Sequence, residues 1–111
     1  MEEIIKQLRE FRDQRDWKQF HNPKDLANAI SIETAELMEH FLWKTQEESY
    51  EKVKNNPKIA EEVADIMIFL IYFAETSGID IEKAVKDKIE KNNKKYSVEK
   101  SKGKSNKYTE L

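Results

Sequence analysis

The segment EEVADIMIFLIYFA, residues 61–74, sets the architecture of the chain, because every position from 66 to 74 is apolar. A helix that is apolar on all sides must be covered on all sides. A domain of 111 residues buries only a limited fraction of its surface, so one copy cannot easily supply that cover. We therefore expect this helix at the centre of a helical bundle that also packs across a subunit interface.

The rest of the chain predicts an all-α domain. It has two Gly and two Pro among 111 residues and shows no strand-like alternation of apolar and polar residues. Asn22 and Asp80 are good N-caps, Pro23 suits the first position of a helix, and Gly78 suits the position after one. These signals predict a bundle of four main helices over residues 2–15, 23–43, 57–77 and 81–96, with a short helix possible over 47–54.

Composition limits the functions that this chain can have. At 111 residues it is one domain, which we place at residues 1–96, followed by a basic tail over 97–111 that is mobile unless it covers a neighbouring subunit. Charged residues make up 38%, yet the net charge is only −2, which argues against binding a nucleic-acid polymer. Cysteine is absent, and no apolar run is long enough to span a bilayer. The first residues are acidic and lack the apolar region of a signal sequence, so we expect none here. We expect a cytoplasmic protein without membrane partners.

Two pairs of carboxylates interrupt apolar helix faces. Glu33 and Glu36 form the first pair, and Glu62 and Asp65 form the second. Each pair is spaced by three residues, so both carboxylates project from one side of a helix, about one turn apart. Glu33 and Glu62 continue apolar rows made of Leu26, Ile30, Leu37 and Phe41, and of Ile59, Ile66, Phe69 and Phe73, respectively. An ionised group at such a position needs a partner or a metal ion.

A divalent cation would explain these carboxylates. Four of them converging on one another would repel, a cation removes that repulsion, and ligation by carboxylates alone suits Mg²⁺. The alternative is a set of solvated helix faces, since the chain has 16 Glu and the spacing recurs in Glu36 with Glu39, Glu48 with Glu51, and Glu10 with Asp13. Position within the apolar rows distinguishes the two pairs, but the pattern alone leaves both interpretations open.

The connection after the first helix, residues 16–21, holds Trp17, Phe20 and His21. It forms either a hydrophobic plug between helices or the wall of a pocket for a flat ligand. Together with Trp43, at the end of the second helix, these rings could sandwich a base and contribute roughly 1–3 kcal/mol. Stacking does not identify the base, and His21 is the one residue of the loop that we consider for a polar contact with its edge.

A cation, an amide and a phenol share one side of the last predicted helix, at Lys88, Asn92 and Tyr96. Side chains of these types can grip a phosphate or a sugar. A solvated polar edge is the commoner meaning of such a row, so this interpretation also stays open.

Several segments resemble one known family. They are RDWKQFHNPKDL, ETAELMEHFLWK, EEVADI and KIEKNNKKY, and together they span residues 15–96. In these segments the chain resembles the MazG-like all-α nucleoside triphosphate pyrophosphohydrolases, and most closely their single-domain, dCTP pyrophosphatase-like branch. The resemblance implies a four-helix MazG-like protomer that assembles into a homo-oligomer, a dimer or a tetramer.

The resemblance also implies an activity and a site. The activity is the hydrolysis of a nucleoside triphosphate to the monophosphate and pyrophosphate, with Mg²⁺ as cofactor or Mn²⁺ in its place. The carboxylates at Glu33, Glu36, Glu62 and Asp65 would bind the metal and carry catalysis. The residues that would bind the substrate are Lys88, Asn92 and Tyr96 on the phosphate side and His21 and Trp43 on the base side. A pyrimidine such as dCTP is the base that the resemblance favours.

Three alternatives compete with this hypothesis. A relative that acts on dUTP or on a modified or damaged nucleotide would share the same metal motif. A di-iron bundle needs a Glu-x-x-His motif from each of two helices, and neither of the two His fits. A non-catalytic helical interaction module would explain the charged helices, but not acidic residues within apolar rows.

Overall fold

The computed structural model describes residues 1–110, and every regular element among them is a helix. The α-helices are α1 (Glu2–Gln14), α2 (Pro23–Glu39), α3 (Gln46–Asn55), α4 (Lys58–Ser77), α5 (Ile81–Lys95) and α6 (Val98–Ser101), and η1 (Lys18–Phe20) and η2 (Tyr108–Glu110) are short 3₁₀-helices. The predicted all-α class is confirmed. The described residues contain six α-helices: the four main ones, α3 where a short helix was considered possible, and α6 within the predicted tail.

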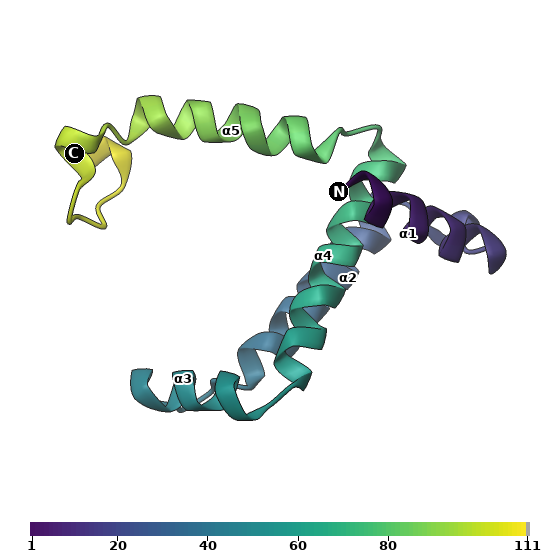
Figure 1. The fold of residues 1–111 in the computed structure, drawn as a ribbon, viewed down its shortest axis with the longest axis horizontal. Helices are drawn as coiled ribbons and strands as arrows, with labels where there is room; N and C mark the ends of the chain where they lie inside the picture. Colours follow the sequence, from purple (N-terminus) through teal and green to yellow (C-terminus); the bar gives the residue numbers. More distant parts are fainter. Residues whose placement is uncertain (111) are drawn as a thin grey trace. The chain divides into compact units, whose positions relative to one another are not determined.

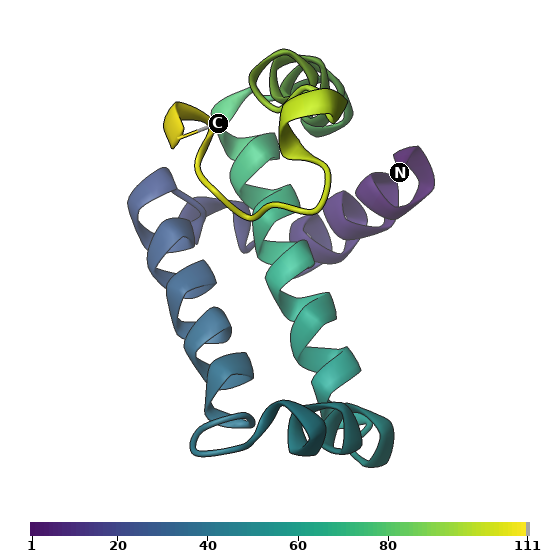
Figure 2. The same ribbon diagram turned by 90° about the vertical axis from the view of Figure 1, so that its left-hand side faces the viewer.

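One compact unit, Met1–Ile79, is built around α2 and α4. These two helices run side by side in Figure 1 and Figure 2, and α3 joins the end of α2 to the start of α4. The hydroxyl of Tyr72 in α4 donates a hydrogen bond to the backbone oxygen of Leu8 in α1 at 2.8 Å. The buried apolar residues of the unit are Leu26 of α2 and Ile59, Ile71, Tyr72 and Ala74 of α4. Each fully buried Leu or Ile contributes roughly 1.5–3 kcal/mol.

Three helix boundaries lie where local signals predict, namely the starts of α2 and α5 and the end of α4. The side chain of Asn22 accepts a hydrogen bond from the backbone nitrogen of Asp25 at 3.0 Å, with Pro23 as the first helical residue. Gly78 ends α4 with φ of 68°, a left-handed conformation that a residue without a Cβ adopts readily. Because these caps satisfy exposed backbone groups, they fix the bounds of the helices that carry the site.

The expected end of the second helix was wrong. We predicted it near Trp43, but α2 ends at Glu39. The backbone nitrogens of His40, Phe41 and Leu42 donate to oxygens three residues earlier, at 3.0–3.3 Å, so the chain tightens into turns. Trp43 then adopts φ of 62°. A left-handed residue cannot continue a right-handed helix, so the chain leaves the direction of α2 here.

The apolar segment in α4 is only partly covered. Ile71 is 1% exposed, whereas Val63, Met67 and Leu70 are 52%, 48% and 37% exposed. These three residues follow one another at steps of four and three, so they form one stripe on the helix surface. One chain therefore does not cover these three residues, which we call the α4 stripe, and the expected packing across a subunit interface stays a prediction.

The second unit, from Asp80 to the end of the described chain, contains α5, α6 and η2. Asp80 caps α5, as predicted, by accepting from the backbone nitrogen of Lys83 at 3.1 Å. At the other end, the rings of Tyr96 and Tyr108 lie 6.1 Å apart, nearly perpendicular. Lys95 Nζ lies 4.9 Å from the centre of the Tyr108 ring. The predicted tail thus contacts the end of α5 over its described part.

Among the described residues, no helix has both the length and the apolar character that crossing a membrane requires.

Candidate functional site

A cavity of about 330 Å³ lies between α1 and α4. Its walls are mostly apolar, and two polar residues that we predicted for the site, His21 and Asp65, both line it. The other lining residues are Leu8, Phe11, Trp17, Ile68, Phe69 and Tyr72. Its size and its apolar walls with few polar groups are typical of a small-molecule site. Trp17 and His21 of the loop over residues 16–21 therefore border a cavity, and a ligand bound there stays a prediction.

His21, which lines this cavity, has a buried ring nitrogen without a hydrogen-bond partner in the described chain. Its Nδ1 is buried and has no hydrogen bond within the described chain, and its ring lies 4.6 Å from the ring of Tyr72. Burial lowers the pKa of His21, and the positive charge of Arg12 lowers it further. The imidazole is therefore neutral at pH 7, with one nitrogen that can donate and one that can accept. An unsatisfied buried polar atom calls for an explanation, and a polar ligand atom would provide one.

Sequence reasoning missed two residues of this region. Arg12 is only 7% exposed and contacts Asp13 through Nε at 2.8 Å. Its position, four residues after Leu8, would have placed it on the apolar side of α1. Tyr72 lies seven residues after Asp65, on the same side of α4, and that spacing would have identified it too.

A second hollow adjoins His21 and is more polar. It measures about 490 Å³ and is lined by Arg9, Arg12, Lys18, His21, Glu75 and Thr76. Arg9 is not available to an anion there, because its guanidinium forms a two-bonded ion pair with Glu75. Arg12 is also paired, with Asp13 at 2.8 Å, which leaves Lys18 as the cation lining this hollow without such a pair in the described chain.

The four predicted metal ligands lie on α2 and α4. The two that we placed in apolar rows, Glu33 and Glu62, are half-buried, whereas Glu36 and Asp65 are exposed. Burial raises the pKa of Glu33, and the negative charges of Glu36, Asp65 and Glu62 raise it further. The pair on α2 and the pair on α4 are therefore within electrostatic reach of each other.

The described residues contain no group of three or more acidic, histidine or cysteine side chains arranged to hold a metal ion as they stand. The donors nevertheless fit a hard cation, because all four are carboxylates and their negative charges repel one another. A cation would remove the repulsion that raises the pKa of Glu33.

The aromatic sandwich does not form within one chain. Trp17 lines the cavity, but Phe20 and Trp43 are 64% and 92% exposed and are absent from its walls. Trp43 does not lie on α2 as predicted, because α2 ends at Glu39 and the backbone of Trp43 is left-handed. Its role on the base side stays a prediction.

The predicted phosphate contacts belong to the second unit. Lys88 and Asn92 lie on α5 and Tyr96 ends it, and all three are exposed. The row that we predicted is present, since all three sit on one regular helix and its cap. Their role with phosphate stays a prediction.

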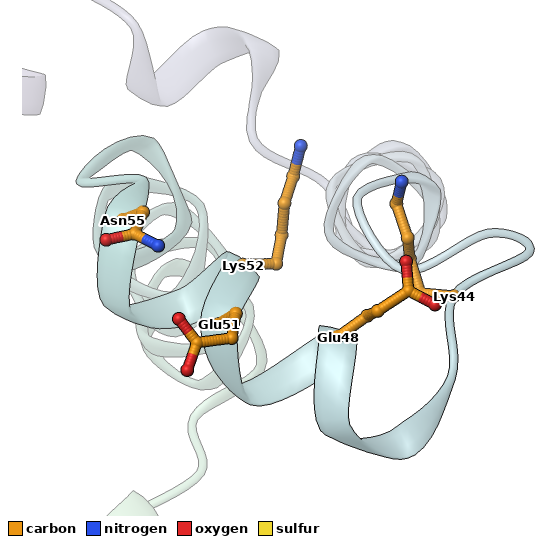
Figure 3. Close-up of a pocket in the computed structure, with 5 residues that line it drawn as sticks. All are labelled: Lys44, Glu48, Glu51, Lys52 and Asn55. Atoms are coloured by element: carbon orange, nitrogen blue, oxygen red, sulfur yellow. The ribbon is translucent and has the colours of Figure 1, made fainter.

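A shallow hollow along α3, shown in Figure 3, contains none of the predicted site residues. Its lining is Lys44, Glu48, Glu51, Lys52 and Asn55. Glu48 completes the cap of α3 with Thr45, so its carboxylate has a structural role. The recurrent acidic spacing of Glu48 and Glu51 is therefore a solvated helix face here.

Comparison with known proteins gives three concordant findings. A model described as the MazG-like family matches residues 28–111. The dCTP pyrophosphatase 1 of Bos taurus is 37% identical over 100% of this chain and 68% of its own length, and that of Homo sapiens is 35% identical over 100% and 67%. The crystal structure of a pyrophosphatase from Archaeoglobus fulgidus is similar at a TM-score of 0.82 and 44% identity, over 87% of this chain and 92% of that one.

Proposed function

This chain belongs to the MazG-like family and is a nucleoside triphosphate pyrophosphatase, and we propose that it hydrolyses a pyrimidine deoxynucleoside triphosphate such as dCTP. The products would be the monophosphate and pyrophosphate, a reaction suited to clearing unwanted nucleotides from the cytoplasm. The observation that carries the proposal is that His21 and Asp65 line the same cavity. One residue suits a base edge and the other suits a metal-bound phosphate, as a nucleotide requires.

The apolar part of the cavity would hold the base. Phe11 and Trp17 meet edge to face, with ring centres 5.7 Å apart, which gives this wall a fixed shape. A base placed against such rings is removed from water, and His21 would then satisfy its buried Nδ1 through the base edge. A site built on such a bond rejects bases that leave the polar atom unpaired.

The carboxylates Glu33, Glu36, Glu62 and Asp65 would hold Mg²⁺, or Mn²⁺ in its place. When bound, the ion neutralises triphosphate charge and stabilises the charge that develops during transfer. Lys88, Asn92 and Tyr96 would contact phosphate or sugar as a cation, an amide and a phenol. Phosphoryl-type transfer depends mainly on positioning and charge, so these side chains suffice without a nucleophilic residue.

A comparison of dCTP, dUTP, dTTP and dATP as substrates tests the proposal. We expect Mg²⁺-dependent release of pyrophosphate with the highest kcat/KM for dCTP, and no release when EDTA removes the ion. His21→Ala should reduce the preference among bases by about 10-fold, the value of roughly one lost hydrogen bond.

Phe20→Ala is the matched control for that comparison, because Phe20 is an exposed neighbour outside the cavity. A wild-type preference for dATP would end the pyrimidine proposal. A preference for dUTP would favour the alternative substrate at the same site. If Phe20→Ala changed selectivity and His21→Ala did not, the base would bind elsewhere.

We also propose that the α4 stripe packs against a second copy of the chain. Its three residues, Val63, Met67 and Leu70, are 37–52% exposed, so covering what remains of each would contribute roughly half of the 1.5–3 kcal/mol that full burial gives. Sedimentation at micromolar concentration should show a dimer or tetramer for the wild type and a smaller species for Met67→Lys. Val53→Lys, at an exposed apolar residue of α3, should sediment like the wild type. A monomeric wild type would refute the assembly.

A further inference from the structure

His40 lies where α2 ends, and its imidazole meets a carboxylate of α4. Nε2 of His40 lies 2.6 Å from Oε2 of Glu62, and each side chain is 19% exposed. Oε2 is buried and has no well-aligned hydrogen bond in the described chain. The distance from Nε2 to Oε2 is short enough for a hydrogen bond, but the N–H bond does not point at the oxygen. A buried carboxylate oxygen needs a donor, and Nε2 is the polar atom beside it.

Asn56, between α3 and α4, determines which nitrogen of His40 carries the proton. Its Oδ1 accepts a hydrogen bond from the backbone nitrogen of Lys58 at 3.0 Å. The Nδ2 of the same amide therefore faces Nδ1 of His40, at 3.5 Å. Because an amide NH₂ group only donates, the tautomer that fits this contact has Nδ1 as the acceptor and the proton on Nε2. That nitrogen is the one beside Glu62.

We propose that His40, oriented by Asn56, is a positioning residue that donates from Nε2 to Glu62 and orients this carboxylate for the metal ion. The inference rests on the proposed function, because it takes Glu62 as a metal ligand. The contact engages one oxygen of Glu62 and leaves the carboxylate one further oxygen for the ion. Partners of this kind fix the orientation of a ligand, and losing one lowers metal affinity or activity by roughly 10–100-fold.

The place of His40 in the chain supports this role. It follows Glu33 by seven residues and Glu36 by four, so it lies on the side of α2 that carries the first pair of carboxylates. Through Glu62 it reaches the second pair, and through Asn56 it reaches the start of α4. His40 thus links the two helices that would share the ion.

Binding of Mn²⁺ to the nucleotide-free protein tests the proposal without turnover. Electron paramagnetic resonance of the unbound ion gives the dissociation constant. We expect His40→Leu, which keeps bulk and loses the donor, to weaken Mn²⁺ binding by roughly 10–100-fold. His40→Gln should recover most of that loss, since its amide nitrogen can replace Nε2. Met38→Gln, at a 66% exposed residue in the last turn of α2, is the control and should bind as the wild type does.

Wild-type Mn²⁺ affinity in His40→Leu would overturn the proposal, and so would equal losses in the Leu and Gln variants. The nitrogen chemical shifts of the wild-type imidazole give a second test that needs no variant to fold. A proton on Nδ1 would overturn the proposal, whereas a proton on Nε2 supports it. A wild-type protein that binds no Mn²⁺ and releases no pyrophosphate would instead refute the proposed function, and with it this inference.

Discussion

Asp65→Asn and Glu33→Gln should each lower kcat for dCTP hydrolysis by on the order of 10³-fold. Losing a residue that merely orients a metal ligand costs roughly 10–100-fold, so losing a ligand should cost more. A 10³-fold loss corresponds to about 4 kcal/mol of transition-state stabilisation. Both variants keep the shape of the side chain and remove its charge. Initial rates of pyrophosphate release at saturating Mg²⁺ provide the measurement.

Glu51→Gln is the matched control for these variants. Glu51 shares the three-residue spacing with Glu48, but it lies on the solvated face of α3. Its substitution should leave kcat within a factor of about two, as surface changes away from a site usually do. If either Asp65→Asn or Glu33→Gln kept the rate of Glu51→Gln, that carboxylate would not be a required ligand.

Thermal unfolding shows whether the lower kcat of Glu33→Gln comes from the lost carboxylate or from a damaged fold. The pKa of Glu33 is raised in the folded, metal-free chain by burial and by neighbouring carboxylates. Its contribution to stability is therefore present below its ordinary pKa and is lost as pH rises through the raised value. At pH 7 the metal-free Glu33→Gln variant should melt no lower than the wild type, and the two should converge near pH 4. A lower melting temperature at pH 7 would attribute the lost activity to the fold.

Trp43→Gly should lower the activity of the enzyme without lowering the stability of the fold. Trp43 is 92% exposed and has φ of 62°, a conformation that costs a residue with a Cβ about 1 kcal/mol. Glycine adopts it without strain, so the free energy of unfolding of one chain should stay the same or rise by about 1 kcal/mol. If Trp43 stacks on the base, kcat/KM for dCTP should fall by roughly 10–100-fold, the value of one stacking contact.

Trp43→Phe is the control for this prediction, because it keeps an aromatic ring at the same backbone position. It should retain most of the activity that Trp43→Gly loses. Denaturant unfolding gives the stability, and steady-state kinetics with dCTP gives the activity. Full activity in Trp43→Gly would remove Trp43 from the site.

The bounds of most helices could be predicted from the sequence because caps and apolar periods are local. Asn22 and Pro23 begin α2, Gly78 ends α4, and Asp80 begins α5, as predicted. The carboxylate pairs were recognisable for the same reason, since a three-residue spacing places two side chains on one side of any helix. Their position in apolar rows also predicted which member of each pair, Glu33 or Glu62, would be more buried.

Only the tertiary structure identified which side chains of different helices contact each other. A periodic row of residues identifies one face of a helix, but not the residues that this face contacts. The end of α2 lies four residues before Trp43, in turns beside the contacts of His40 with Glu62 and Asn56. The cavity likewise joins Trp17 and His21 to Asp65 and Tyr72, although more than forty residues separate the two sets. Local signals in the sequence thus predicted the side chains available on each helix, and the packing of α1 and α2 against α4 determined which of them share a site.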